Sequence, residues 1–144
     1  MGLRDALNDE NKKGAIIQDA IKVVDAEVAD KSGLSGFAVK KGYDAVKSIK
    51  PGFIQEAVER LLPDMADKLE PLWEEGKKSG APRAHLEKNR SQVADALLSV
   101  TDGKVERAKS AMVKSTYKML RGSAKKNVEE AVPRLCGLLE KHAG

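Results

Sequence analysis

Aromatic residues and cysteine are scarce in this chain. Five of the 144 residues are aromatic and one is cysteine. So few aromatics disfavour a β-sandwich or barrel, and they also disfavour a surface that stacks nucleobases. One cysteine cannot form an intrachain disulfide, which indicates a reducing compartment. The chain has no run of 18 uncharged apolar residues, and its first nine residues lack the apolar region of a signal peptide, so we expect a cytoplasmic protein that does not enter a membrane.

Histidine is scarce as well, which argues against a metal centre. A di-iron site in a helical bundle needs Glu-x-x-His pairs, but Pro82 and Leu139 stand where the glutamates of His85 and His142 would be. One cysteine and two isolated histidines do not make a zinc site either. We assign His85 to a linker or a first helical turn and His142 to a frayed C-terminus. The sequence therefore predicts no metal and no other cofactor.

The candidate nucleophiles lack partners. Cys136 lies among leucines on a predicted helix, where a small buried hydrophobic residue is expected rather than a reactive thiol. Ser115 and Ser123 are each followed three residues later by a lysine, as in some acyl-transfer enzymes, but the accompanying Lys-Thr-Gly and Ser-Asp-Asn motifs are missing. The glycine-rich segment 31–36 precedes a helix and lacks the Gly-Lys-Ser/Thr ending of a P-loop, so a tight turn is expected there rather than a phosphate site. These features predict a protein that is not an enzyme.

The second half of the chain resembles the first. At an offset of 74 residues, the segments 38–62 and 112–136 share eight identical pairs of 25, against about two expected from average composition. Tyr43 aligns with an identical Tyr117, and Lys47 aligns with the similar Arg121. This similarity predicts a duplicated unit of about 70 residues. Repeat 1 would span about residues 9–75 and repeat 2 about residues 83–143, joined by a linker at about residues 76–82.

Apolar residues at helical spacing predict six helices in two sets of three. The first set has helices of about 10–31 and 36–49 and a third that begins at residue 51. The second set has a helix that carries the apolar residues between 86 and 100, a helix of about 103–121, and a third capped by Ser123. Leu3 and Leu7 indicate a short extra turn that docks on the domain. We expect one all-α domain over residues 1–144, with two tandem three-helix repeats about a pseudo-two-fold axis.

The third helix of each set carries a proline and a predicted core position. Pro63 and Pro133 fall inside these helices, where a kink or a break is expected. The prolines match at an offset of 70 rather than 74, so the repeat register in these helices stays open. Leu61 and Leu135 are identical partners and are predicted to occupy equivalent buried sites.

Four segments together resemble an uncharacterised family of small, all-helical bacterial proteins. They are DAEVADKSGLSGFAVKKGYDAVKSIKPG, ERLLPDMADKLEP, ADALLSVTDGKVERA and GSAKKNVEEAVPRL. The resemblance covers nearly the whole chain and implies a helical single domain. It implies no activity, ligand or catalytic residue.

Positive charge gathers in one stretch. Residues 104–126 hold eight Lys or Arg and one acid, Glu106. On a helix, most of these basic residues share one face, opposite a predicted inner face that includes Met112, Thr116 and Met119. The candidate residues for binding an anion or a partner are Lys104, Arg107, Lys114, Lys118, Arg121, Lys125 and Lys126.

These observations predict a non-enzymatic helical module for binding or assembly. Its expected partner is an acidic protein surface or a second copy of the chain, and plain solvation of the basic face is the alternative. A nucleic-acid-associated protein that grips phosphates without reading sequence, through the basic helix 103–126, is a second hypothesis. A small-ligand carrier or enzyme with a pocket at the repeat interface is a third.

Overall fold

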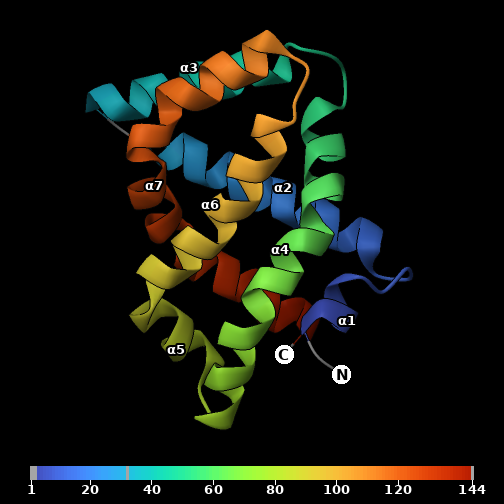
Figure 1. Ribbon diagram of the computed structural model, residues 1–144. Helices are drawn as coiled ribbons and strands as arrows, with labels where there is room; N and C mark the ends of the chain where they lie inside the picture. Colours follow the sequence, from blue (N-terminus) through green and yellow to red (C-terminus); the bar gives the residue numbers. More distant parts are fainter. Residues whose placement is uncertain (1–2, 32, 144) are drawn as a thin grey trace.

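The computed structural model describes residues 3–31 and 33–143, and in these ranges it contains seven α-helices and no strand. The helices are α1 Leu3–Leu7, α2 Lys13–Asp30, α3 Gly33–Lys47, α4 Phe53–Lys78, α5 Pro82–Lys88, α6 Arg90–Glu106 and α7 Ala111–Ala143 (Figure 1). The all-α prediction is confirmed. The predicted number of six helices is wrong, because the expected docking turn at Leu3 and Leu7 is itself a helix, α1; the described second half has three helices with boundaries other than those predicted.

The first half follows the predicted order. The predicted docking turn is helix α1, whose Leu3 and Leu7 are buried. A turn with Pro51 and Gly52 separates α3 from α4, and Gly52 has a φ of +75°, a backbone conformation that favours glycine. Helix α4 continues through Pro63 without a break and ends at Lys78, so only residues 79–81 remain between α4 and α5.

The second half has different helix boundaries. The Asn89 side chain donates a hydrogen bond to the His85 carbonyl oxygen at 2.9 Å and helps to end α5, so the first predicted helix of this half is two helices, α5 and α6. Helix α6 runs on to Glu106, across the predicted start of the next helix. The Ser110 hydroxyl accepts a hydrogen bond from the Val113 N–H at 3.3 Å, which is the contact of an N-cap, and α7 begins at the following residue.

Helix α7 is continuous where two helices were predicted. The predicted cap, Ser123, lies inside α7, and its hydroxyl donates a hydrogen bond to the Leu120 carbonyl oxygen. The aligned positions of Pro51 and Gly52 hold Lys125 and Lys126, which allow a helix to continue. Figure 1 shows that α7 nevertheless changes direction, from a first part beside α3 to a last part near α1. The described chain is therefore not divided into two matching sets of three helices.

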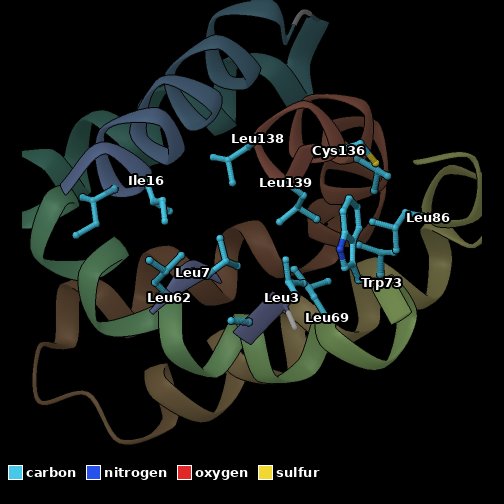
Figure 2. Close-up of a cluster of buried hydrophobic side chains, with 14 residues drawn as sticks. Leu3, Leu7, Ile16, Leu62, Leu69, Trp73, Leu86, Cys136, Leu138 and Leu139 are labelled. Atoms are coloured by element: carbon cyan, nitrogen blue, oxygen red, sulfur yellow. The ribbon is translucent and has the colours of Figure 1, made fainter. Parts of the chain in front are cut away.

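One cluster of buried apolar side chains joins α1, α2, α4, α5, α6 and the second part of α7. Trp73 is 1% exposed and lies among Leu69, Leu86 and Leu139 (Figure 2). The cluster comprises Leu3, Leu7, Ile16, Ile17, Leu62, Ala66, Leu69, Trp73, Leu86, Val93, Val132, Cys136, Leu138 and Leu139. Its members come from both halves of the chain, so the two halves share one core.

The predicted burial of Leu61 and Leu135 is wrong by one position. Both side chains are half-buried, whereas their neighbours Leu62 and Cys136 are 8% and 0% exposed. Leu62 and Cys136 are also aligned at the 74-residue offset. The inward face of α4 continues from Leu62 through Ala66 and Trp73. The helix is therefore rotated by about one residue from the orientation that would bury Leu61.

Ion pairs tie the end of α2 to the second part of α7. Arg134 Nη1 lies 2.9 Å from Glu27 Oε1, and the guanidinium also pairs with Asp30. Lys31 Nζ lies 3.0 Å from Glu130 Oε2. The guanidinium bonds keep Arg134 protonated and raise its pKa, with the bond to Asp30 as the main cause. These contacts hold the C-terminal end of α2 against the second part of α7.

Candidate functional site

Helix α3 and the first part of α7 form a layer at one end of the molecule. They run antiparallel and lie side by side (Figure 1), and Gly42 of α3 is in close contact with Leu120 of α7. We define the outer layer as residues 33–50 and 107–126. No member of the buried apolar cluster comes from these two segments among the described residues. The layer therefore stands outside the main core.

The outer layer carries most of the positive charge of the chain. Its two segments hold eleven Lys or Arg and one acid, Asp44, a net charge of +10. The remaining residues hold fifteen Lys or Arg and twenty-one Asp or Glu, a net charge of −6. The total charge of +4 thus conceals a strongly polar distribution, with a basic end and an acidic body. Such a field attracts anionic partners to one end of the molecule.

The seven basic residues singled out from the sequence do not share one helix. Lys104 is on α6, Arg107 follows the end of α6, and the other five are on α7. Three of the seven are engaged in ion pairs with the body. These pairs are Lys104 with Asp64 at 3.2 Å, Arg121 with Asp102 at 2.9 Å, and Lys125 with Asp95 at 3.2 Å. Arg121 and Lys125 thereby help to hold the outer layer to the body, whereas the pair of Lys104 with Asp64 joins α6 to α4.

The other four predicted binding residues are exposed. Arg107, Lys114, Lys118 and Lys126 make no ion pair with any residue that the structure describes. Lys40 and Lys41 of α3 are exposed as well. Free cations on both antiparallel helices give the layer an extended basic surface.

Three large apolar side chains are exposed on the same layer. Phe37, Met112 and Met119 are 59%, 50% and 61% exposed. Met112 and Met119 had been predicted on an inner face together with Thr116, and of these three residues only Thr116 is buried. The ammonium of Lys41 lies 4.9 Å from the centre of the Phe37 ring, a cation–π contact. The surface is therefore basic and apolar together.

A pocket of about 380 Å³ opens beside the outer layer, between α2, α3 and the start of α4. The Tyr43 hydroxyl donates a 2.5 Å hydrogen bond to Asp25 Oδ1, and the Lys47 ammonium lies 5.0 Å from the centre of the Tyr43 ring. Burial, together with the hydrogen bond to Asp25, raises the pKa of Tyr43 well above its usual value. The tyrosine is thus a neutral hydrogen-bond donor at physiological pH. The lining residues are Gln18, Ile21, Asp25, Tyr43, Lys47, Gly52, Phe53, Ile54 and Gln55.

The aligned tyrosine of the second half makes a similar contact. The Tyr117 hydroxyl donates a 2.5 Å hydrogen bond to Asp102 Oδ1 and lies 2.7 Å from the Thr101 hydroxyl. Arg121 donates to both oxygens of Asp102, from Nε at 2.9 Å and from Nη2 at 3.2 Å. The bonds from Arg121 and then from Tyr117 lower the pKa of the Asp102 carboxyl.

The glycine-rich segment 31–36 contains one closely packed glycine, Gly36. A Cβ atom at Gly36 would lie 2.6 Å from the carbonyl carbon of Lys31, so only glycine fits there. Gly33 has a φ of +75° and opens α3. Ser32 lies outside the described residues. From Gly33 onward, the first turn of α3 therefore takes the place of the predicted tight turn.

The two histidines and the cysteine have structural contacts. His85 Nε2 lies 3.2 Å from Glu75 Oε2, and His142 Nε2 lies 2.7 Å from Asp19 Oδ2. The side chain of His142 is 8% exposed, so the prediction of a frayed C-terminus is wrong. Cys136 is buried as predicted, and burial raises its pKa to about 11. No three His, Cys, Asp or Glu side chains of the described residues converge to hold a metal ion.

Comparison with known proteins gives a family. The model of the Family of unknown function (DUF6918) matches residues 3–143. No curated protein and no solved structure matches the chain. None of the helices in the described ranges has the length and apolar character needed to cross a bilayer. The resemblance to an uncharacterised helical family, noted from the sequence, is confirmed, and the chain belongs to the family of unknown function DUF6918.

Proposed function

We propose that this protein is a non-enzymatic binding module whose outer layer docks an acidic protein surface. The observation that carries the proposal is the coincidence of a net charge of +10 with three exposed apolar side chains in the outer layer. Protein interfaces combine buried apolar anchors with complementary charge at their rim. Phe37, Met112 and Met119 are suitable anchors, since Phe and Met are both enriched at interfaces.

The cations of the outer layer have two different roles in this proposal. Arg107, Lys114, Lys118 and Lys126 have no ion pair with a described residue, so an acidic partner does not have to break an existing contact to reach them. Arg121 and Lys125 are already paired with Asp102 and Asp95 and serve to position the layer. This division makes the four unpaired cations the binding residues of the proposal.

The similarity of the two halves fits this function. We infer that the outer layer retains the clearest remnant of a duplication, in which α3 and the first part of α7 derive from the same ancestral helix. The identical Tyr43 and Tyr117 each bond an aspartate on the preceding helix, which supports the inference. Two related basic helices side by side offer a wider surface than either one alone.

Binding of nucleic acid is the second candidate. The basic surface alone would suit a phosphate backbone, but a phosphate backbone gains little from exposed methionines. An acidic protein gains from both the charge and the methionines. A second copy of this chain is a special case of an acidic partner, because its body carries a net charge of −6.

The experiment uses a synthetic amphipathic peptide with Glu on one helix face and Leu on the other, alongside a 20-base-pair DNA duplex and vesicles rich in anionic lipid. Three variants are compared with the wild type by fluorescence anisotropy. One carries Lys114→Glu, Lys118→Glu and Lys126→Glu, and another carries Met112→Ser and Met119→Ser. The matched control carries Lys22→Glu, Lys68→Glu and Lys88→Glu, three exposed lysines of the body that make no ion pair with a described residue.

The proposal predicts that the acidic peptide binds and that both outer-layer variants weaken this binding, whereas the body control binds as the wild type does. Affinity should fall with salt, because part of it is electrostatic. DNA or vesicle binding tighter than peptide binding, or peptide binding that is unchanged in the methionine variant, would contradict it. A rise of molar mass with concentration in light scattering, abolished by the outer-layer charge reversals, would identify a second copy as the acidic partner.

A further inference from the structure

The pocket between α2, α3 and α4 has the size and the polarity of a small-ligand site. Its volume of about 380 Å³ lies near the lower end of the range for ligand pockets, which suits a small metabolite. Ile21, Phe53 and Ile54 supply apolar wall, while Gln18 and Gln55 add polar amides. Asp25 and Lys47 bring opposite charges to the same lining. The pocket therefore offers a carboxylate and an ammonium to one occupant.

The second half of the molecule contains a similar tyrosine–aspartate pair, and there an arginine of the protein already binds the carboxylate. Asp102 accepts from Tyr117, and the Arg121 guanidinium completes the carboxylate by bonding both of its oxygens. Two parallel N–H donors of one guanidinium fit a carboxylate well. The Tyr117–Asp102 pair is thus a guanidinium site that the protein fills with its own arginine.

The first half holds the pair but not the guanidinium. Tyr43 aligns with Tyr117 and Lys47 aligns with Arg121, while Asp25 and Asp102 lie 77 residues apart rather than 74 and are alike in accepting the hydrogen bond of the tyrosine. The Lys47 ammonium lies over the Tyr43 ring, and among the described residues Asp25 makes no ion pair. Asp25 is exposed and lines the pocket, so its carboxylate is accessible to a cation from solution.

We propose that this pocket binds a small molecule that carries both a guanidinium and a carboxylate, with the guanidinium on Asp25 and the carboxylate on Lys47. Arginine is the simplest compound of this class. Tyr43 holds the Asp25 side chain in place through its hydroxyl, as Tyr117 does for Asp102. The ammonium of Lys47 repels a ligand that carries positive charge alone, so simple amines should bind less well than a ligand that also carries a carboxylate.

The neighbouring charges agree with this assignment. Besides Asp25, the charge of Asp44 also acts on Tyr43. Asp44 is exposed and does not line the pocket. It is therefore the matched control for a charge change at Asp25, because Asp44→Asn removes the same charge from the adjacent helix.

The test is a titration of the full chain followed by amide chemical shifts in NMR, with three ligands. L-arginine has both groups, agmatine lacks the carboxylate, and L-citrulline replaces the guanidinium by a neutral group of similar shape. The expected result is saturable binding of L-arginine, with shifts in α2, α3 and the start of α4. Agmatine and citrulline should bind more weakly. Asp25→Asn should weaken arginine binding by about tenfold or more, because one partner of a charged pair is lost, and Asp44→Asn should not.

Several results would overturn the inference. One is the absence of saturable arginine binding up to about 10 mM, which is the range of very weak ligands. Another is equal binding of arginine by the wild type and by Asp25→Asn, with both proteins folded by circular dichroism. Equal affinities for arginine and agmatine would show that Lys47 does not bind the carboxylate of the ligand. Because this site does not include the exposed methionines or the four unpaired cations, its failure is separate from that of the proposed protein-binding function.

Discussion

Gly42 lies directly against Leu120 where α3 meets the first part of α7. A Cβ atom at residue 42 would be 2.7 Å from Leu120 Cδ1 and 3.3 Å from its Cγ. Gly42 is buried although it lies in the outer layer, which has little other burial. The missing side chain is thus what allows the two helices to approach closely, and the contact is a sensitive point of the layer.

Valine at position 42 should therefore destabilise the protein. A branched side chain in this space forces Leu120 to move, which typically costs about 1–3 kcal/mol. In the Leu120→Ala background, the Gly42→Val change should cost less, because the space is then available. The free energies of unfolding of the four proteins, measured in urea, give the coupling. Gly14→Val is the control, since Gly14 is exposed and no atom lies within 4 Å of a Cβ built there. Equal losses at residues 14 and 42 would contradict the contact.

Helical spacing predicts the helices of the first half well because its breaks are local. Pro51 followed by Gly52 indicates a turn and is visible in the sequence, although a single proline such as Pro63 does not end a helix here. In the second half, Ser110 and Ser123 both precede helix-forming residues, but only Ser110 caps a helix. The choice between them depends on how α7 packs along α3 and α6. That packing involves residues far apart in the chain, which local patterns do not contain.

The inward face of α4 was predicted with an error of one residue for a related reason. The prediction placed Leu61 in the core and did not single out Ala66 and Trp73, which are buried. Small and aromatic residues weaken a stripe that is drawn from aliphatic side chains alone. The space at Ala66, which is 0% exposed, is set by the neighbouring helices rather than by α4 itself.

Leu62 should therefore be more important for stability than Leu61. Leu62→Ala removes a buried side chain from the central cluster and should lower the free energy of unfolding by about 2–5 kcal/mol. Leu61→Ala should cost clearly less, because Leu61 is half-buried. Urea midpoints of the two single variants provide the comparison. A larger loss for Leu61→Ala would restore the stripe predicted from the sequence.

Cys136 should be unreactive in the folded protein. The side chain is fully buried, its Sγ lies 3.9 Å from the Arg83 carbonyl oxygen, and burial raises its pKa to about 11. At pH 8 the thiol is then protonated and inaccessible, so a thiol reagent should react only as the protein unfolds. The labelling rate should follow the concentration of urea through the unfolding transition. Complete labelling within seconds in buffer would be incompatible with the buried position.

The position of the positive charge could be predicted from the sequence, but which of the cations are paired with aspartates could not. Six of the seven predicted basic residues lie in the outer layer, where the positive charge concentrates, and Lys104 precedes it on α6; of the seven, Lys104, Arg121 and Lys125 are paired with aspartates. Those partners come from α4 and α6 and do not appear in any local pattern. The exposure of Met112 and Met119 was also missed, because an apolar residue on a helix is assigned to the inside by default.

Asp102 should contribute to stability at neutral pH and lose this contribution in acid. The hydrogen bond from Arg121 is the main cause that lowers the pKa of Asp102 below its ordinary value of 3.8 in the folded state. A carboxyl with a lowered folded pKa stabilises the protein above its unfolded pKa, and the benefit disappears as pH falls through the folded value.

The wild type should therefore be more stable than Asp102→Asn at pH 7, and the gap should narrow as the pH falls from about 5 to 2, the window in which a lowered aspartate titrates. The acids Asp19, Glu56 and Glu130 also have lowered pKa values, but they are present in both proteins and cancel in the difference. Urea midpoints at a series of pH values measure the gap, with Asp44→Asn as a control at an exposed aspartate that has no ion pair with a described residue. A gap of the same size at pH 7 and pH 2 would show that the Asp102 carboxylate does not stabilise the contact between α6 and α7 through its charge.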